Sequence, residues 1–266
     1  MQSSKLYTTD GKVKWFTNES DVNEKLSSIL GEKFENYRKK WDAVNRFEVE
    51  TDFPLFLQIE TNQICNLQCP SCPIGVPEAH KKYITTEKMP SEIFERIILE
   101  GEKYGCPSVE PQGTNEPLLN QIKFAADHGF IDIMLNTNAT LLSESRARSM
   151  LKSGITRIRF SLDASTKETY EKVRLGAKYD ITMKNIEAFL KIKKEEQYEL
   201  PVVGVNFVKQ KANEHEEKEF IETWIDKVDF IVVQEFQTPD VDHDYSDFLP
   251  LESDYRKKLM TDFRCQ

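Results

Sequence analysis

The residues best suited to chemistry are Cys65, Cys69 and Cys72, three cysteines within eight positions. They follow a run over 55–60 in which apolar residues alternate as in a β-strand, so we expect the thiols in a loop directly after that strand. Thiolates this close repel one another unless a metal ion or cluster shares their charge. Soft sulfur ligands suit zinc or an iron–sulfur cluster.

The spacing of these cysteines, CxxxCxxC, helps to separate the two metals. Structural zinc sites usually take four protein ligands in two CxxC pairs, and no second pair lies nearby. His80 or Cys106 would have to complete a zinc site at an irregular spacing. A [4Fe–4S] cluster held by three cysteines leaves one iron open to a substrate or cofactor. We therefore favour the cluster and keep zinc as the alternative.

Composition excludes several classes of protein. With 266 residues, the chain is long enough to bury a sizeable core. A net charge of −9 argues against non-specific nucleic-acid binding, which needs a basic surface. The chain has no apolar run of about 18 residues and no apolar signal core, so we expect no membrane association. The odd number of cysteines does not suit a secreted disulfide framework, which predicts a cytoplasmic location.

The chain divides into three predicted regions. Residues 1–52 form an N-terminal extension that is mostly helical, with one helix starting at Asp21 and a second marked by apolar positions over 34–44. Residues 53–240 form the core. Residues 241–266 form a C-terminal segment.

The core alternates between strand-like and helix-like stretches. Expected strands cover 55–60, 108–112, 131–135, 155–162, 202–208 and 230–233. Such strand–helix units form a parallel sheet with right-handed crossovers. Six units are too few to close an eight-stranded barrel, so we predict an α/β fold, a partial (β/α)6 TIM-like barrel. Its last strand needs a cover from the N-terminal helices, the C-terminal segment or a second chain.

Catalytic groups of such barrels gather at the carboxyl ends of the strands. Polar residues follow the expected strands as this rule requires. They include Gly113-Thr114-Asn115-Glu116, Asn136-Thr137-Asn138, Ser161, Asp163 and Asn206.

The cysteine loop and these segments together resemble the radical S-adenosylmethionine (SAM) superfamily. The resemblance implies that Cys65, Cys69 and Cys72 hold a [4Fe–4S] cluster whose open iron is chelated by SAM. It also implies an enzyme that reductively cleaves SAM to a 5′-deoxyadenosyl radical, which removes a hydrogen atom from a substrate.

The resemblance also assigns cofactor-binding residues. Glu116 accepts a hydrogen bond from the SAM ammonium group, and Gly113 allows close approach of the backbone. Thr114-Asn115 stands where relatives usually have a glycine. Ser161 and Asp163, two apart in one strand, both reach the ribose hydroxyls.

Three further residues carry an assignment. Arg174 pairs with the SAM carboxylate, to which a guanidinium offers a two-pronged contact. Asn138 and Asn206 match polar positions near the cofactor.

The resemblance extends to partners. It implies a flavodoxin or ferredoxin-type electron donor and a small-molecule or peptide substrate. The helical extension resembles that of enzymes that act on sugars of surface polysaccharides. The alternatives are a peptide-modifying maturase or epimerase, a non-catalytic zinc or iron–sulfur protein, and an inactive remnant that serves as an interaction partner. Cys265 resembles the first cysteine of a SPASM domain, which would make the chain a truncated or split member of that group.

Overall fold

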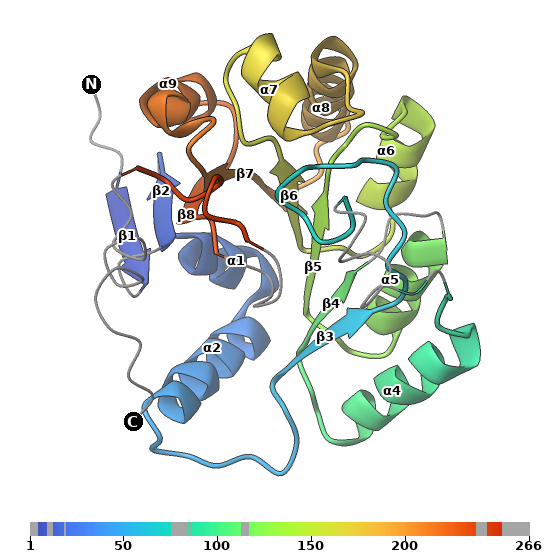
Figure 1. The fold of residues 1–266 in the computed structure, drawn as a ribbon. Helices are drawn as coiled ribbons and strands as arrows, with labels where there is room; N and C mark the ends of the chain where they lie inside the picture. The colour runs from blue at the N-terminus through green and yellow to red at the C-terminus, as the bar shows by residue number, and fades with distance from the viewer. Residues whose placement is uncertain are drawn as a thin grey trace.

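The computed structural model describes residues 5–9, 13–18, 20–75, 85, 87–112, 117–237 and 244–251. Within them, eight strands form one open sheet in the order β1-β2-β8-β7-β6-β5-β4-β3 (Figure 1). The last six strands in the chain are parallel and lie side by side in chain order. They are β3 Phe56–Glu60, β4 Ser108–Gln112, β5 Asp132–Thr137, β6 Arg157–Ser161, β7 Val202–Lys209 and β8 Phe230–Glu235. The predicted partial (β/α)6 barrel is confirmed.

Helices between the strands cover the outer face of the sheet. They are α4 Ser91–Lys103, α5 Pro117–Asp127, α6 Glu144–Leu151, α7 Lys167–Val173, α8 Tyr179–Glu195, the 3₁₀ turn η1 Glu214–Glu216 and α9 Glu217–Trp224. Ile133, Ile158, Val205 and Ile231 point outward from successive strands into one buried core with these helices. Since side chains alternate along a strand, the residues between them face the inner side.

Two N-terminal helices pack on the inner side. α1 Val22–Leu30 begins with a capping box in which the Asp21 side chain accepts from the N3 backbone and Glu24 reaches back. α2 Glu32–Asn45 follows Gly31, whose φ of 70° ends α1. Their apolar side chains bury inward-facing residues of β7 and β8 in a second core. In Figure 1 the two helices lie across the open side, between the β1–β2 hairpin and β3.

The edge at β8 is covered by the start of the chain. β1 Lys5–Thr9 and β2 Val13–Thr17 form an antiparallel hairpin, and β2 continues the sheet antiparallel to β8. Trp15 stacks on Phe230 with ring centroids 5.4 Å apart. We had predicted a mostly helical extension over 1–52, so the sheet extends further than we expected.

The end of the described chain packs beside the carboxyl ends of β7 and β8. Tyr245 and Leu249 bury against Phe236 in a small separate cluster. Of the C-terminal segment expected over 241–266, only 244–251 lie within the described residues. Within the described residues, none of the helices combines the length and the apolar composition that a membrane-spanning segment requires.

Candidate active site

The cysteine loop follows β3 directly, as predicted. Cys69 is buried, Cys65 and Cys72 are half-buried, and all three are free thiols. The Cys72 N–H donates to the Cys69 carbonyl at 3.0 Å and the Gly75 N–H to the Cys72 carbonyl at 2.8 Å. A Cβ at Gly75 would lie 2.2 Å from the Cys69 carbonyl oxygen, so only glycine permits this tight coil. The coil gathers the thiols on a short stretch of backbone.

The protonation of these thiols is set by burial and by their neighbours. Burial raises the pKa of the Cys69 thiol, and Arg174 opposes that rise. Cys72 and Cys65 raise the same pKa further, so the three sulfurs are close enough to interact electrostatically. A shared cationic metal centre would relieve this repulsion.

The loop is anchored to the neighbouring strand ends. Asn138, just after β5, donates to Asn66 Oδ1 at 3.1 Å, and its Nδ2 lies 3.8 Å from Cys65 Sγ. Asn66 also donates to Thr140 Oγ1 at 2.9 Å. The Gln68 N–H donates to the Leu175 carbonyl at 2.9 Å, in the loop after α7. Asn138 therefore lies against the cysteine loop, while its contact with SAM stays a prediction.

Arg174 and Asp163 form a buried ion pair beside the thiols. The guanidinium also lies close enough to the Cys69 thiol to interact with it electrostatically. Asp163 Oδ1 accepts from the Val208 N–H at 2.8 Å. Burial acts to lower the pKa of Arg174, but Asp163 and Cys69 outweigh it and hold the pKa above its usual value. Burial raises the pKa of Asp163 against the opposing effect of Arg174.

The strand argument for Ser161 and Asp163 is wrong. β6 ends at Ser161, and Asp163 has a φ of 61°, in the left-handed region. Its carboxylate therefore turns to Arg174 and Val208 rather than continuing the strand alternation. The ribose contacts of Ser161 and Asp163, and the carboxylate contact of Arg174, remain predictions.

Two buried polar atoms near this ion pair have no hydrogen-bond partner in the part of the chain that the structure describes. They are Arg174 Nε and Asn206 Oδ1. Asn206 lies opposite Ser161 in the β6–β7 register. Unpaired buried polar atoms are costly, so they mark places for polar groups that this chain does not supply. With three soft thiols alongside, the donor set fits a [4Fe–4S] cluster and the amino-acid and ribose groups of SAM.

Some predicted site residues lie elsewhere. Gly113, Glu116, His80 and Cys265 lie outside the described residues. Cys106 is buried before β4, and its thiol donates to the Ser108 carbonyl at 3.6 Å. Its side chain packs in the main hydrophobic core, as expected of a structural thiol.

Sequence reasoning missed a polar network on the inner face. Glu110 of β4, Asn136 of β5 and Arg159 of β6 contact one another across three adjacent strands. Polar residues at alternate positions of otherwise apolar strands were the available signal. We had noted only Asn136.

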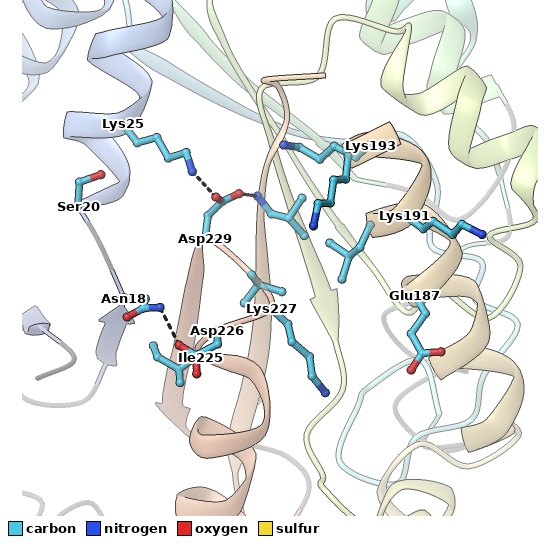
Figure 2. A pocket seen from close by; sticks show the side chains of 14 residues that line it. Asn18, Ser20, Lys25, Glu187, Lys191, Lys193, Ile225, Asp226, Lys227 and Asp229 are labelled. Carbon is cyan, nitrogen blue, oxygen red and sulfur yellow. Dashed lines mark hydrogen bonds and ion pairs between the residues drawn. The ribbon is translucent and has the colours of Figure 1, made fainter. Parts of the chain in front are cut away.

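A cavity of about 690 Å³ lies away from the thiols. Figure 2 shows lysines of α1 and α8 around it, with Lys25 paired to Asp229 and Asn18 to Asp226. Asp229 immediately precedes β8, so the cavity lies at the amino ends of the strands. Because the thiols follow the carboxyl end of β3, this cavity is not the site of the proposed chemistry.

The chain is similar to known enzymes over most of its core. It is 28% identical over 172 residues to a GTP 3′,8-cyclase of Desulforamulus reducens, covering 62% of this chain and 50% of that protein. It is 26% identical over 202 residues to a probable GTP 3′,8-cyclase of Methanococcus maripaludis, covering 73% and 63%. The chain thus spans about half to two thirds of the length of these curated relatives.

Solved structures share the fold. Streptococcus suis SuiB bound to S-adenosylmethionine matches with a TM-score of 0.59 at 17% identity, covering 94% of this chain and 66% of that one. Native anSMEcpe with bound AdoMet matches with a TM-score of 0.56 at 17% identity, covering 73% and 56%.

The family assignment rests on the sequence match. Residues 59–222, more than half of the chain, match the radical SAM superfamily. Members of this family are enzymes that use a [4Fe–4S] cluster and SAM, and the cysteine loop lies within the matched range. The chain belongs to the radical SAM superfamily.

Proposed function

We propose that this protein reductively cleaves SAM and uses the resulting 5′-deoxyadenosyl radical to take a hydrogen atom from a small-molecule substrate. The observation that carries the proposal is the meeting of the cysteine loop with the buried Arg174, whose Nε has no partner among the described residues. The cluster, when reduced, supplies the electron for SAM cleavage.

In this proposal, one group of residues holds the cluster and another binds SAM. Cys65, Cys69 and Cys72 hold the cluster, and Asn138 and Asn66 fix their loop. Arg174 and Asn206 offer buried polar atoms to SAM. Ser161 faces the same side of the sheet as Asn206, as a ribose contact requires. Glu116 and Gly113 complete the SAM site, as the resemblance implies.

The proposed substrate is a small polar molecule that contains a sugar, and the hydrogen atom is removed from that sugar. Two of the curated relatives are a GTP 3′,8-cyclase and a probable GTP 3′,8-cyclase, named for a nucleotide. The inner face of the sheet carries hydrogen-bonding side chains, which suit a polyhydroxylated group. We retain a sugar of surface polysaccharide biosynthesis as the specific proposal. A flavodoxin or ferredoxin-type protein supplies the electron, and a reducing cytoplasm suits the free thiols.

A second candidate is modification of a peptide. One solved structure with the same fold is Streptococcus suis SuiB bound to the precursor peptide SuiA, with a TM-score of 0.53 at 20% identity. Likeness at this identity shows the fold alone, so the small-molecule proposal stays first.

The test is reductive SAM cleavage by anaerobically purified protein with dithionite. We expect 5′-deoxyadenosine and methionine from the wild type and from Cys106→Ala, and neither product from Cys69→Ala. Cys106 is the matched control because it is a buried thiol outside the loop. Equal product from Cys69→Ala and the wild type would refute the proposal, and a colourless, zinc-loaded protein would establish the alternative metal.

A further inference from the structure

Arg159 lies on the inner face of the sheet. Its strand neighbours Ile158 and Phe160 are buried in the outer core, so strand alternation directs Arg159 inward. Asn136 lies opposite it in the β5–β6 register. Glu110 lies on the next strand and approaches both residues. Three adjacent strands therefore present a charged, hydrogen-bonded group to the interior.

The inner face is closed one layer below Arg159, toward the amino ends of the strands. Arg157 donates to both carboxylate oxygens of Asp132, at 2.7 and 2.9 Å. It also donates to Asn23 Oδ1 at 3.0 Å and lies over the Phe34 ring at 5.6 Å. α1 and α2 thus seal this level. Arg159 is the next inward-facing residue of β6 toward the thiols.

Arg159 has hydrogen-bond donors to spare. Its Nε donates to Asn136 Oδ1 at 2.7 Å, but its nearest terminal nitrogen is 3.9 Å from Glu110 Oε1, too far for a hydrogen bond. No other hydrogen bond of this guanidinium is made with the residues that the structure describes. The side chain is 15% exposed, so its terminal groups are not sealed in.

Glu110 is engaged differently. The Asn136 side-chain nitrogen donates a hydrogen bond to the Glu110 carboxylate, and the Asn136 side-chain oxygen accepts one from Arg159. Asn136 therefore separates the two charges and orients both. Burial lowers the pKa of Arg159, the charge of Glu110 opposes that effect, and the nearby charge of Arg157 adds to it.

We propose that Arg159 binds an oxyanion of the substrate, either a carboxylate or a phosphate. This inference rests on the proposed function. A planar guanidinium with unused terminal donors matches the two oxygens of such a group. Because Asn136 holds the guanidinium at Nε, its terminal nitrogens are already oriented, and the side chain loses little conformational freedom when it binds the anion. An anionic group held here leaves the rest of the substrate directed toward the thiols.

The test uses the holoprotein with its cluster and SAM. Isothermal titration compares three probes, namely glucose 1-phosphate, glucuronate and glucose. We expect the wild type to bind at least one anionic sugar ten- to a hundredfold more tightly than glucose, the range for a charged hydrogen bond. The better anion identifies phosphate or carboxylate as the preferred group.

Substitutions locate the effect. Arg159→Gln should remove the preference for the anionic sugar, and Arg159→Lys should keep only part of it, since an ammonium lacks the fork. Arg96→Gln, an exposed arginine on α4, should keep the full preference. If Arg159→Gln folds poorly, the double variant Glu110→Gln/Arg159→Gln takes its place, because it removes both opposite charges of the network together.

Two failures can be told apart. Wild-type protein that lacks iron or does not cleave SAM contradicts the proposed function. If iron and SAM cleavage are present, the inference about Arg159 is overturned by equal binding of glucose and both anions. It is also overturned if the variants without Arg159 keep the preference.

Discussion

Replacing Arg174 should leave the buried Asp163 carboxylate without its counterion. The side chains of Arg174 and Asp163 are 16% and 6% exposed, so water cannot replace either partner. Breaking a buried pair usually costs about 3–5 kcal/mol. In Arg174→Met, Asp163 keeps the Val208 N–H bond and can take up a proton, since burial already raises its pKa. We therefore expect a loss near the lower limit, about 3 kcal/mol at pH 7.

The assay is urea unfolding of cluster-free protein under anaerobic conditions. Asp163→Asn/Arg174→Met should recover more than half of the lost unfolding free energy, because the amide needs no counterion. The loss in Arg174→Met should shrink as the pH falls. When the pKa of a carboxyl is higher in the folded than in the unfolded protein, its contribution to the free energy of unfolding is most favourable below the unfolded pKa. That contribution is lost as the pH rises through the folded pKa. A loss under about 1 kcal/mol, the value of an exposed pair, would refute the reasoning.

Three further substitutions test the surrounding structure. Burial raises the pKa of Glu216, but hydrogen bonds from Thr166, Thr169 and Ser165 outweigh it and lower the pKa, so its stabilisation is lost as pH falls through that lowered value. Glu216→Gln should flatten the fall in melting temperature below about pH 5, and an unchanged pH profile would contradict this. Gly204→Val places a Cβ 2.3 Å from the Phe230 ring and should cost about 1–3 kcal/mol in urea unfolding, which Phe230→Leu should partly relieve. Asp21→Ala removes the N-cap of α1 and should cost about 1 kcal/mol; no change would show that the capping box contributes little.

Local patterns predicted the six parallel strands, the cysteine loop and the α1 cap. These depend on alternation, spacing and capping residues that lie close together in the chain. The β1–β2 hairpin was harder to predict because β2 is completed by β8, more than 200 residues away, as in the pairing of Val13 with Gln234. Its stability comes from this pairing and from the Trp15–Phe230 contact rather than from its own sequence.

The candidate site was predicted in part. The thiols and Asn138 were identified from residue types that follow expected strands, and Asn206 from its place inside one. Arg174 was assigned only through the family resemblance. The Arg174–Asp163 pair was not, because it depends on the left-handed backbone at Asp163, an uncommon conformation that strand periodicity does not anticipate. The Glu110–Asn136–Arg159 network needs the strand register, which the sequence does not fix.

The central claim is that Cys65, Cys69 and Cys72 hold a [4Fe–4S] cluster to which SAM binds. The most direct measurement is iron content together with the electron paramagnetic resonance spectrum of the reduced protein, with and without SAM. We expect about four irons per chain in the wild type and in Cys106→Ala, with a spectrum that changes when SAM is added. Cys69→Ala should lose the iron and the signal. Retention of the full cluster in Cys69→Ala, or a wild-type spectrum that SAM leaves unchanged, would contradict the account.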